Sequence, residues 1–324
     1  MSFEHIIGQD RAVRFLTRAY EKNRVPHALL FAGIPGTGKR TTALALARLL
    51  QCQSAKGAVA CGICPACKKI DSGNHPDIVF IEPSGSLIKI GQIRTLRNEF
   101  ALKPFEGNKR VAIITDAHAM NSEAANTFLK ILEEPPKGSF MILTAHQVSD
   151  LLPTIVSRCQ HIAFAPLSPA LIAVKLVTDR KIDRHAADIA AVWANGSLGM
   201  ALKADAVKVA EERNQLIERF ETLSLHTMQS LLNFAESLSK DKDNLLNNLE
   251  VLKVWLRDIL FGKLCPERTL NKDLMEKIKE ISKGYSVSSL LKKIKIVQGA
   301  QVDAQKGRNR RLILEVMLIR LCRE

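Results

Sequence analysis

The segment Gly33–Arg40 (GIPGTGKR) matches the phosphate-binding pattern G-x-x-x-x-G-K-[ST] through Lys39 and departs from it at Arg40. In such a loop the backbone N–H groups point at phosphate oxygens, and the helix that follows adds its positive N-terminal end. Arg40 stands where a Ser or Thr hydroxyl would hold Mg²⁺. We therefore expect phosphate contacts to survive, with weak or absent binding of ATP or ADP, through these residues: Gly33, Gly36, Thr37, Gly38 and Lys39.

A second departure follows the apolar segment 111–115, which ends at Asp116. A carboxylate at this position can orient Mg²⁺ through water. Hydrolysing proteins of this class usually have a Glu next, which polarises the attacking water, and this chain has Ala117, which cannot accept a proton. Thr41 and Thr42 lie further along the helix after the loop and point in other directions. Neither is expected to replace the missing hydroxyl.

Four cysteines lie close together in the sequence with the spacing C-x8-C-x2-C-x2-C: Cys52, Cys61, Cys64 and Cys67. Two C-x-x-C steps bring thiolates together at tight turns, and four sulfurs satisfy tetrahedral Zn²⁺. A closed four-sulfur shell leaves no open coordination position, so the expected role is structural. An iron–sulfur cluster and a redox pair are the alternatives, although nothing ferredoxin-like surrounds the cysteines.

The elements that must position these residues alternate along the first half of the chain. Short apolar segments typical of buried strands lie at 27–32, 77–82, 110–115, 139–144 and 161–164, and helices are expected between them, for example at 9–23, 90–102 and 121–133. This alternation predicts a parallel α/β sheet. The sequence APLSP at 165–169 breaks the pattern. Residues 168–206 are typical of short helices, and from about 208 onward apolar residues repeat at helical spacing.

The 324 residues are 46% hydrophobic and carry a formal net charge of +14, which favours a polyanionic partner. The positive charge is densest from Lys283 to Arg311. Aromatic residues make up only 5%, so a base-stacking platform is not expected. No run approaches the roughly 18 apolar residues of a membrane span, and the N-terminal residues lack a secretion pattern. We expect a cytoplasmic protein with no membrane partner.

Several segments together resemble the clamp-loader subunits of the AAA+ family: Phe3-x-x-Ile6-Ile7-Gly8-Gln9-Asp10, the loop at 33–39, NTFLKILEEPP at 126–136 and Ser157-Arg158-Cys159. A four-cysteine module after the loop helix also belongs to bacterial members. The resemblance implies an α/β plus all-α fold: an AAA+ P-loop domain at 1–165 with a zinc module at about 52–70, a small helical lid domain at 166–207, and a helical collar domain for oligomerisation at 208–324.

Three further residues take their expected roles from this resemblance. Arg158 matches the family arginine that reaches across a subunit boundary to the γ-phosphate of a neighbour's ATP, where a guanidinium stabilises the transferring phosphoryl group. Thr144 matches the polar sensor position that contacts γ-phosphate or water. Gly199, in the segment GSLG at 196–199, replaces a ligand-sensing arginine. It is a third loss beside Arg40 and Ala117.

The resemblance and the three losses together imply a largely non-hydrolysing stator of the DNA polymerase III clamp loader in DNA replication, itself without ATPase or polymerase activity. Its implied partners are the gamma/tau motor subunit and the delta subunit, with the sliding clamp and primed DNA reached through the complex. The alternative is an active gamma/tau-like ATPase motor that uses Thr41 and another acid. A zinc-dependent nucleic-acid binder is a third hypothesis, which rests on the net charge and the four cysteines.

Overall fold

The computed structural model describes residues 2–107, 109–224, 228–240, 244–306 and 308–324. The chain divides into two compact units, Met1–Ser168 with Ser197–Gly199, and Pro169–Gly196 with Met200–Glu324. The first division falls inside the predicted break at 165–169. The further boundary at residue 207, between a lid and a collar domain, stays a prediction.

The first unit is built on a five-stranded parallel sheet with the order β2-β3-β4-β1-β5. The strands are β1 (Ala28–Ala32), β2 (Ile78–Ile81), β3 (Arg110–Ile114), β4 (Ser139–Ala145) and β5 (Gln160–Ala163). β1 and β3 are buried along their whole length, as expected for strands covered on both faces. All five strands lie where the apolar segments predict them, to within about a residue at each end, and the predicted parallel sheet is confirmed.

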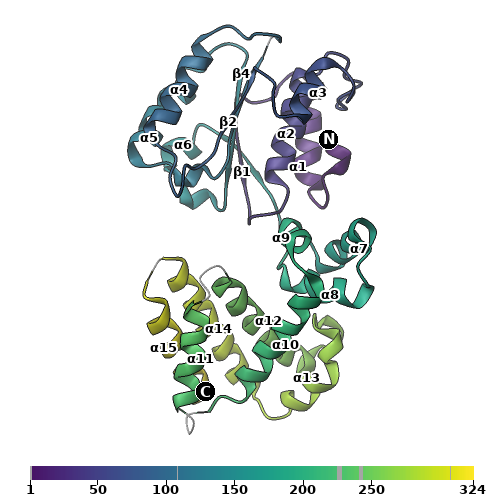
Figure 1. Cartoon of the computed structure of the whole chain (residues 1–324), viewed down its shortest axis with the longest axis vertical. Coiled ribbons are helices and arrows are strands. Elements are labelled where there is room, and N and C mark those ends of the chain that lie inside the picture. Colours follow the sequence, from purple (N-terminus) through teal and green to yellow (C-terminus); the bar gives the residue numbers. More distant parts are fainter. Residues whose placement is uncertain (1, 108, 225–227, 241–243, 307) are drawn as a thin grey trace. The chain divides into compact units, whose positions relative to one another are not determined.

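Helices cover both faces of this sheet (Figure 1). One layer holds α1 (Asp10–Glu21), α2 (Lys39–Gln51) and α3 (Pro65–Asp71), and the other holds α4 (Ile90–Ala101), α5 (Ser122–Glu133) and α6 (Pro153–Val156). Single 3₁₀ turns occur at Phe3–His5, Ala117–Ala119 and Val148–Asp150. Alternate residues of β1 enter opposite cores: Leu29 and Phe31 pack with the first layer, and Ala28 and Leu30 with the second. This period of two is the side-chain alternation of a strand.

All five strands run in the same direction, so their carboxyl ends meet at one edge of the sheet. The phosphate-binding loop follows β1 at this edge, Asp116 follows β3, and Thr144 lies near the end of β4. Three of the predicted site segments are therefore brought together by topology alone. This edge is also where ligands bind in open parallel sheets.

The second unit is entirely helical in the part of the chain that the structure describes. Its helices are α7 (Pro169–Arg180), α8 (Arg184–Trp193), α10 (Ala206–Glu221), α11 (Met228–Lys240), α12 (Leu245–Leu264), α13 (Met275–Ser282), α14 (Val287–Gln305) and α15 (Arg310–Arg323), with 3₁₀ turns at Pro266–Arg268 and Lys272–Leu274; α9 (Leu198–Lys203) starts in the segment that belongs to the first unit. The predicted apolar stripe of α12 is core, with Leu252, Trp255 and Ile259 buried. None of the helices described here is both long and apolar enough to span a bilayer.

Candidate nucleotide and metal sites

The segment Gly33–Arg40 has the backbone conformation expected of a phosphate-binding loop, despite its departure from the sequence pattern at Arg40. The Gly33 N–H donates to the Ala145 carbonyl at 3.2 Å, which ties the start of the loop to β4. A Cβ on Gly33 would meet the Phe164 carbonyl oxygen at 2.3 Å, so only glycine fits there. Gly38 has φ 94°, a left-handed conformation that favours glycine, and it caps the N-terminus of α2. The loop and the helix end are thus set as a phosphate site requires.

Lys39 is held inside the loop. Its side chain is buried, and its ammonium donates to the Gly33 carbonyl and to the Ile34 carbonyl, the latter at 2.8 Å. Burial lowers the pKa of Lys39, and the nearby Asp116 carboxylate opposes that shift. The predicted loop lysine and the predicted carboxylate therefore act on each other across the sheet edge.

Arg40 makes its contacts outside the loop. Its side chain is 58% exposed and pairs with Glu82, the residue after β2, at 2.7 Å. Thr42 is buried and donates its hydroxyl to the Gly38 carbonyl at 2.9 Å, within its own helix. The position that should hold Mg²⁺ thus carries a cation, and the Thr42 hydroxyl already has a partner.

Asp116 and Thr144 lie together at the ends of β3 and β4. The Asp116 N–H donates to the Thr144 hydroxyl at 3.1 Å, and Thr144 is buried. Asp116 has φ 50°, a conformation that is uncommon for a residue with a side chain. The turn then carries Ala117 into the core beside Ile88 and Ile114, where it is fully buried. The position expected to hold a catalytic acid in a hydrolysing relative therefore lies in apolar surroundings.

Gly199 lies against the loop, in the segment Ser197–Gly199 that belongs to the first unit. Its N–H donates to the Gly36 carbonyl at 2.9 Å. A Cβ on Gly199 would lie 2.9 Å from the Gly36 Cα, a separation that real Cβ atoms essentially never show. In this arrangement the position predicted to have lost a sensing arginine has no room for a side chain.

Arg158 lies at the opposite edge of the sheet. It comes two residues before β5, whereas the phosphate-binding loop follows the carboxyl end of the neighbouring strand β1, and the two strands pair from Leu29–Gln160 to Ala32–Ala163. The rise from Gln160 to Phe164, beside the loop, is about 13 Å at roughly 3.3 Å per residue. An arginine that starts beyond the far end of this strand does not reach the loop of its own chain.

The Arg158 side chain is held on the surface by residues of its own unit. Its guanidinium pairs with Glu133 at 2.7 Å, and it donates to the Thr154 carbonyl at 3.1 Å. Arg158 is 38% exposed and Glu133 is 49% exposed, so solvent screens the pair. Glu133 ends α5 and belongs to the LEEPP segment, so the structure joins two segments on which the family resemblance rests.

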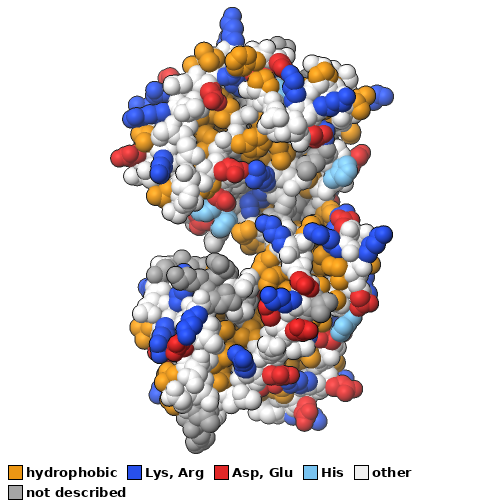
Figure 2. Space-filling view, in the orientation of Figure 1, with side chains coloured by type: hydrophobic (Ala, Val, Ile, Leu, Met, Phe, Trp, Pro, Cys, Tyr) orange, Lys and Arg blue, Asp and Glu red, His pale blue; other side chains and the backbone are white. Residues whose placement is uncertain are grey.

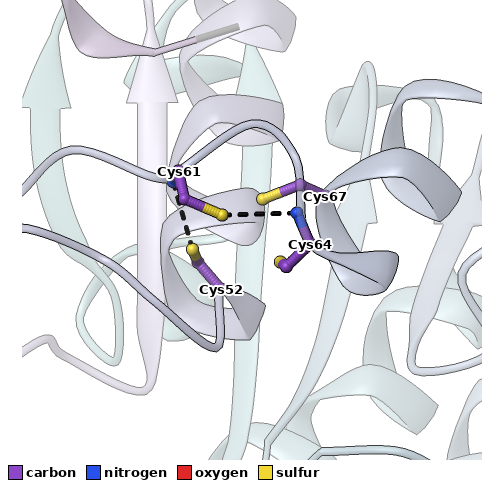
Figure 3. Close-up of side chains that lie close together, drawn as sticks. All are labelled: Cys52, Cys61, Cys64 and Cys67. Atoms are coloured by element: carbon purple, nitrogen blue, oxygen red, sulfur yellow. Dashed lines mark hydrogen bonds between the residues drawn. The ribbon is translucent and has the colours of Figure 1, made fainter.

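The four cysteines converge, as Figure 3 shows. Cys52 follows α2, Cys64 precedes α3, and Cys67 lies on α3 with no exposed surface. The Cys61 N–H donates to the Cys52 sulfur at 3.2 Å and the Cys64 N–H to the Cys61 sulfur at 3.4 Å. N–H bonds from Ile63 and Cys64 lower the pKa of Cys61 to about 6, which favours the thiolate that metals bind.

The four sulfur atoms all lie within 4.8 Å of one another. Sulfurs at about 2.3 Å from a tetrahedral ion are separated by about 3.8 Å, so small side-chain rotations close the shell. This arrangement can hold a metal ion, as the spacing predicts. The N–H···S bonds are of the kind that orient and stabilise thiolate ligands.

The comparisons with known proteins agree with these observations. Family models described as DNA polymerase III, delta subunit, and DNA polymerase III, delta subunit, C terminal, match residues 8–168 and 208–322. The DNA polymerase III subunit delta′ of Bacillus subtilis (strain 168) is 32% identical over 317 residues, which cover 97% of this chain and 96% of that protein. The chain belongs to the DNA polymerase III delta′ family.

Other members of this clamp-loader group are also similar to the chain. The subunit delta′ of Pseudomonas aeruginosa is 37% identical over 196 residues, covering 59% of this chain and 60% of that protein. The subunit tau of Bacillus subtilis is 27% identical over 346 residues, covering 99% of this chain and 61% of that protein. The parallel α/β sheet and the helical second half predicted for the chain are confirmed. The similarity to tau leaves the active-motor alternative open.

The structure gives the delta′-family segment Gly8-Gln9-Asp10 a local role that its sequence alone does not reveal. Gln9 is buried, and its amide donates to the Ala165 carbonyl at 2.8 Å and to the Thr37 carbonyl at 3.4 Å. Its side-chain oxygen accepts from the Ala165 N–H at 3.1 Å. One glutamine thereby ties the phosphate-binding loop to the chain that leaves β5.

Two histidines, His118 and His146, lie beside the phosphate-binding loop. The rings of His118 and His146 stack with centroids 4.4 Å apart, and the His146 Nε2 lies 3.7 Å from an Asp116 carboxylate oxygen. Burial lowers the pKa of His146, as does the neighbouring His118, so the ring favours its neutral form. Their sequence spacing gives no warning of this cluster, because the residues come together only through parallel strand pairing.

Ion pairs neutralise part of the basic run that the sequence shows at 283–311. Within the run Lys283–Arg311, Lys292 pairs with Glu324, Arg308 with Asp303, and Arg311 with Glu315. The face of the second unit in Figure 2 accordingly shows blue side chains interspersed with red ones. On α1 and just after it, by contrast, exposed cations line a shallow hollow and take part in no ion pair among the described residues: Arg11, Arg14, Arg18, Lys22 and Arg24.

Proposed function

We propose that the chain is a largely non-hydrolysing stator of a DNA polymerase III clamp loader. It stacks against a gamma/tau motor subunit and supplies Arg158 in trans to the ATP of that neighbour. It assembles with the delta subunit as well, and through the complex it supports loading of the sliding clamp onto primed DNA in the cytoplasm. The four cysteines hold a structural Zn²⁺.

The observation that carries this proposal is the separation of Arg158 from the chain's own phosphate-binding loop by the length of β5. An arginine that stabilises a transferring phosphoryl group has to reach the γ-phosphate. Since Arg158 cannot reach the loop of its own chain, the geometry supports a role at another subunit's nucleotide. Its screened pair with Glu133 is weak enough to exchange for a phosphate.

The active-motor alternative has less support. A motor needs an oxygen ligand for Mg²⁺ after Lys39 and an acid that faces the attacking water. Arg40 pairs with Glu82, and Ala117 is buried in the core. The loop itself keeps a phosphate-binding shape, so weak nucleotide binding without turnover is the expected remainder.

Equilibrium binding of ATP and ADP to the purified chain, measured beside ATP turnover with and without the gamma/tau subunit, separates the two functions. We expect weak or no binding, no turnover by the chain alone, and increased turnover per motor subunit once the chain is added. Robust turnover by the chain alone refutes the stator proposal and supports the motor.

Lys39→Ala is a matched variant for this experiment. It removes the ammonium that would meet the β- and γ-phosphates of nucleotide bound to this chain. Under the stator proposal the variant loses any residual nucleotide binding yet stimulates the motor as well as the unaltered chain does. If this chain is a motor, the same variant lowers the ATPase of the complex.

The cationic face of α1 supports a contact with the phosphate backbone of primed DNA. Arg14→Glu with Arg18→Glu is expected to weaken DNA binding by the complex similarly for different sequences. If each arginine contacts one phosphate, the slope of log K against log salt falls in magnitude by about 1.8. Lys292→Glu, at a cation already paired with Glu324, is the control. An unchanged slope places the DNA contact elsewhere.

A further inference from the structure

Three potential metal ligands converge beside the phosphate-binding loop: Asp116, His118 and His146. Each offers one ligand atom, and these atoms all lie within 4.8 Å of one another. Asp116 and His118 come from the turn after β3, and His146 follows β4, so two neighbouring strands of the sheet set their positions. The cluster is separate in sequence and in chemistry from the four cysteines.

The donor set decides which metals suit this cluster. Imidazole nitrogen suits Zn²⁺ and other first-row transition ions, whereas Mg²⁺ prefers oxygen and water. Two histidines and one carboxylate match the three-ligand sites in which a fourth position stays open. With Asp116 47% exposed and His146 43% exposed, water or an anion has access to that position.

An independent observation at the same place favours a ligand. The Nδ1 atom of His118 is buried and has no hydrogen-bond partner among the described residues. A buried polar atom without a partner costs about 1–3 kcal/mol and needs an explanation in a native structure. Coordination of a metal ion by this nitrogen would remove that cost.

The distances between the three ligand atoms and the charges around them must be compatible with a bound metal ion. Ligand atoms about 2.1 Å from a tetrahedral ion lie about 3.4 Å apart, and the Asp116 oxygen and His146 Nε2 are already 3.7 Å apart. The half-exposed His146 ring can rotate to close the remaining gap. Lys39 nearby opposes a cation, while the carboxylates of Asp116 and Asp150 act in the other direction on His146.

We infer that Asp116, His118 and His146 form a second metal site, which takes Zn²⁺ or a similar divalent transition ion and leaves one position open to water or an anion. The site does not depend on nucleotide or on a hydroxyl at position 40. It lies where the chain's own nucleotide phosphates would lie, so the ion and the Lys39 ammonium are positioned to attract an anion together.

The test is a titration of the chain, loaded with one Zn²⁺ in the four-cysteine cluster, with Co²⁺ alone. We expect a further equivalent of Co²⁺ to bind with the visible absorption of a nitrogen- and oxygen-ligated ion and without a sulfur-to-cobalt charge-transfer band. His118→Asn and His146→Asn should each weaken this binding by more than the roughly 10–100-fold that loss of an outer-shell partner costs.

His185→Asn, at an exposed histidine on α8, is the control and should leave the titration unchanged. Thermal unfolding of each variant checks that it folds; His146 is exposed enough that its replacement should not disturb the core. Two results overturn the inference: only sulfur-ligated cobalt is seen, or the second equivalent binds equally well to both histidine variants. Because the readout is binding by the isolated chain, its failure leaves the stator proposal standing.

Discussion

The substitution Arg158→Ala should affect ATP hydrolysis at a neighbouring subunit far more than it affects the stability of this chain. The substitution removes the guanidinium proposed to meet a neighbour's γ-phosphate and also breaks the pair with Glu133. Both partners of that pair are more than a third exposed, and such pairs contribute about 0.2–1 kcal/mol. Against a typical stability of about 5–15 kcal/mol, this loss leaves the chain folded.

The effect on catalysis should be much larger than the effect on stability. An arginine finger supplies about 10³–10⁵ in rate, which is about 4–7 kcal/mol of transition-state stabilisation at the ATP site it serves. That site should therefore become silent in the Arg158→Ala complex. The total ATPase rate of the complex should fall at least by the fraction that this site contributes. It should fall further if hydrolysis at one motor site depends on hydrolysis at another.

The assay has three parts. Size-exclusion chromatography with the gamma/tau and delta subunits checks assembly, chemical denaturation of the isolated variant checks stability, and DNA-stimulated ATP turnover of the complex measures catalysis. Arg184→Ala is the matched control, because Arg184 is an exposed arginine in a similar pair, 3.2 Å from Asp188 on α8. It should lose a similar small amount of stability and no turnover.

A second variant tests the pair itself. Glu133→Gln releases Arg158 from its partner, so the cost of exchanging that partner for a phosphate disappears. Turnover of the complex should stay the same or rise by up to about fivefold, the factor that corresponds to about 1 kcal/mol. The reasoning is refuted if Arg158→Ala assembles normally and leaves the DNA-stimulated ATPase of the complex unchanged.

Three further predictions concern the fold and the two sites of the first unit. Asp77→Asn should lower the free energy of unfolding, measured with urea at pH 7, by about 3 kcal/mol, because it leaves buried Arg110 without its carboxylate. Burial raises the pKa of Asp77, but three backbone N–H bonds outweigh this effect and lower the pKa below its usual value. The difference in stability between the variant and the unaltered chain should therefore shrink as the pH falls below about 4. Cys67→Ser should abolish stoichiometric zinc in elemental analysis and lower the melting temperature, and retention of a full equivalent would exclude the four-sulfur site. Arg40→Thr combined with Ala117→Glu should destabilise the chain by about 2 kcal/mol or more without creating ATPase activity, since the new carboxylate enters the core; measurable turnover would show that the turn can reorient.

The parallel sheet and its edge could be predicted from local sequence. Each strand is a short apolar segment between turn signals, and burial on both faces makes that pattern strong. The phosphate-binding loop up to Lys39 could also be predicted from the sequence, because its glycines have local causes. Gly33 leaves room for the Phe164 carbonyl, and Gly38 adopts a positive φ. The cysteine spacing predicted a cluster because the four residues lie within a few turns of one another.

What could not be predicted depends on residues that meet through tertiary structure. Nothing near His118 in the sequence points to His146, which joins it only because β3 and β4 pair. The pairing of Arg158 with Glu133 needs the end of α5 to return to the start of β5. Some ion pairs also depend on tertiary structure: Lys292, in the basic run at 283–311, pairs with Glu324 at the end of the chain.

The positions of the phosphate-binding loop and of Arg158 give the first unit a direction. One edge of the sheet carries the phosphate-binding loop, and the opposite edge carries the arginine proposed to act on a neighbour's nucleotide. If the arginine of each subunit contacts the phosphate-binding loop of the next, the subunits form a head-to-tail series in which every contact has the same polarity. A member that offers the arginine while its own loop cannot react ends such a series on one side. In an assembly built this way, the number of reacting sites is smaller than the number of subunits, and adding another copy of this chain adds no reaction.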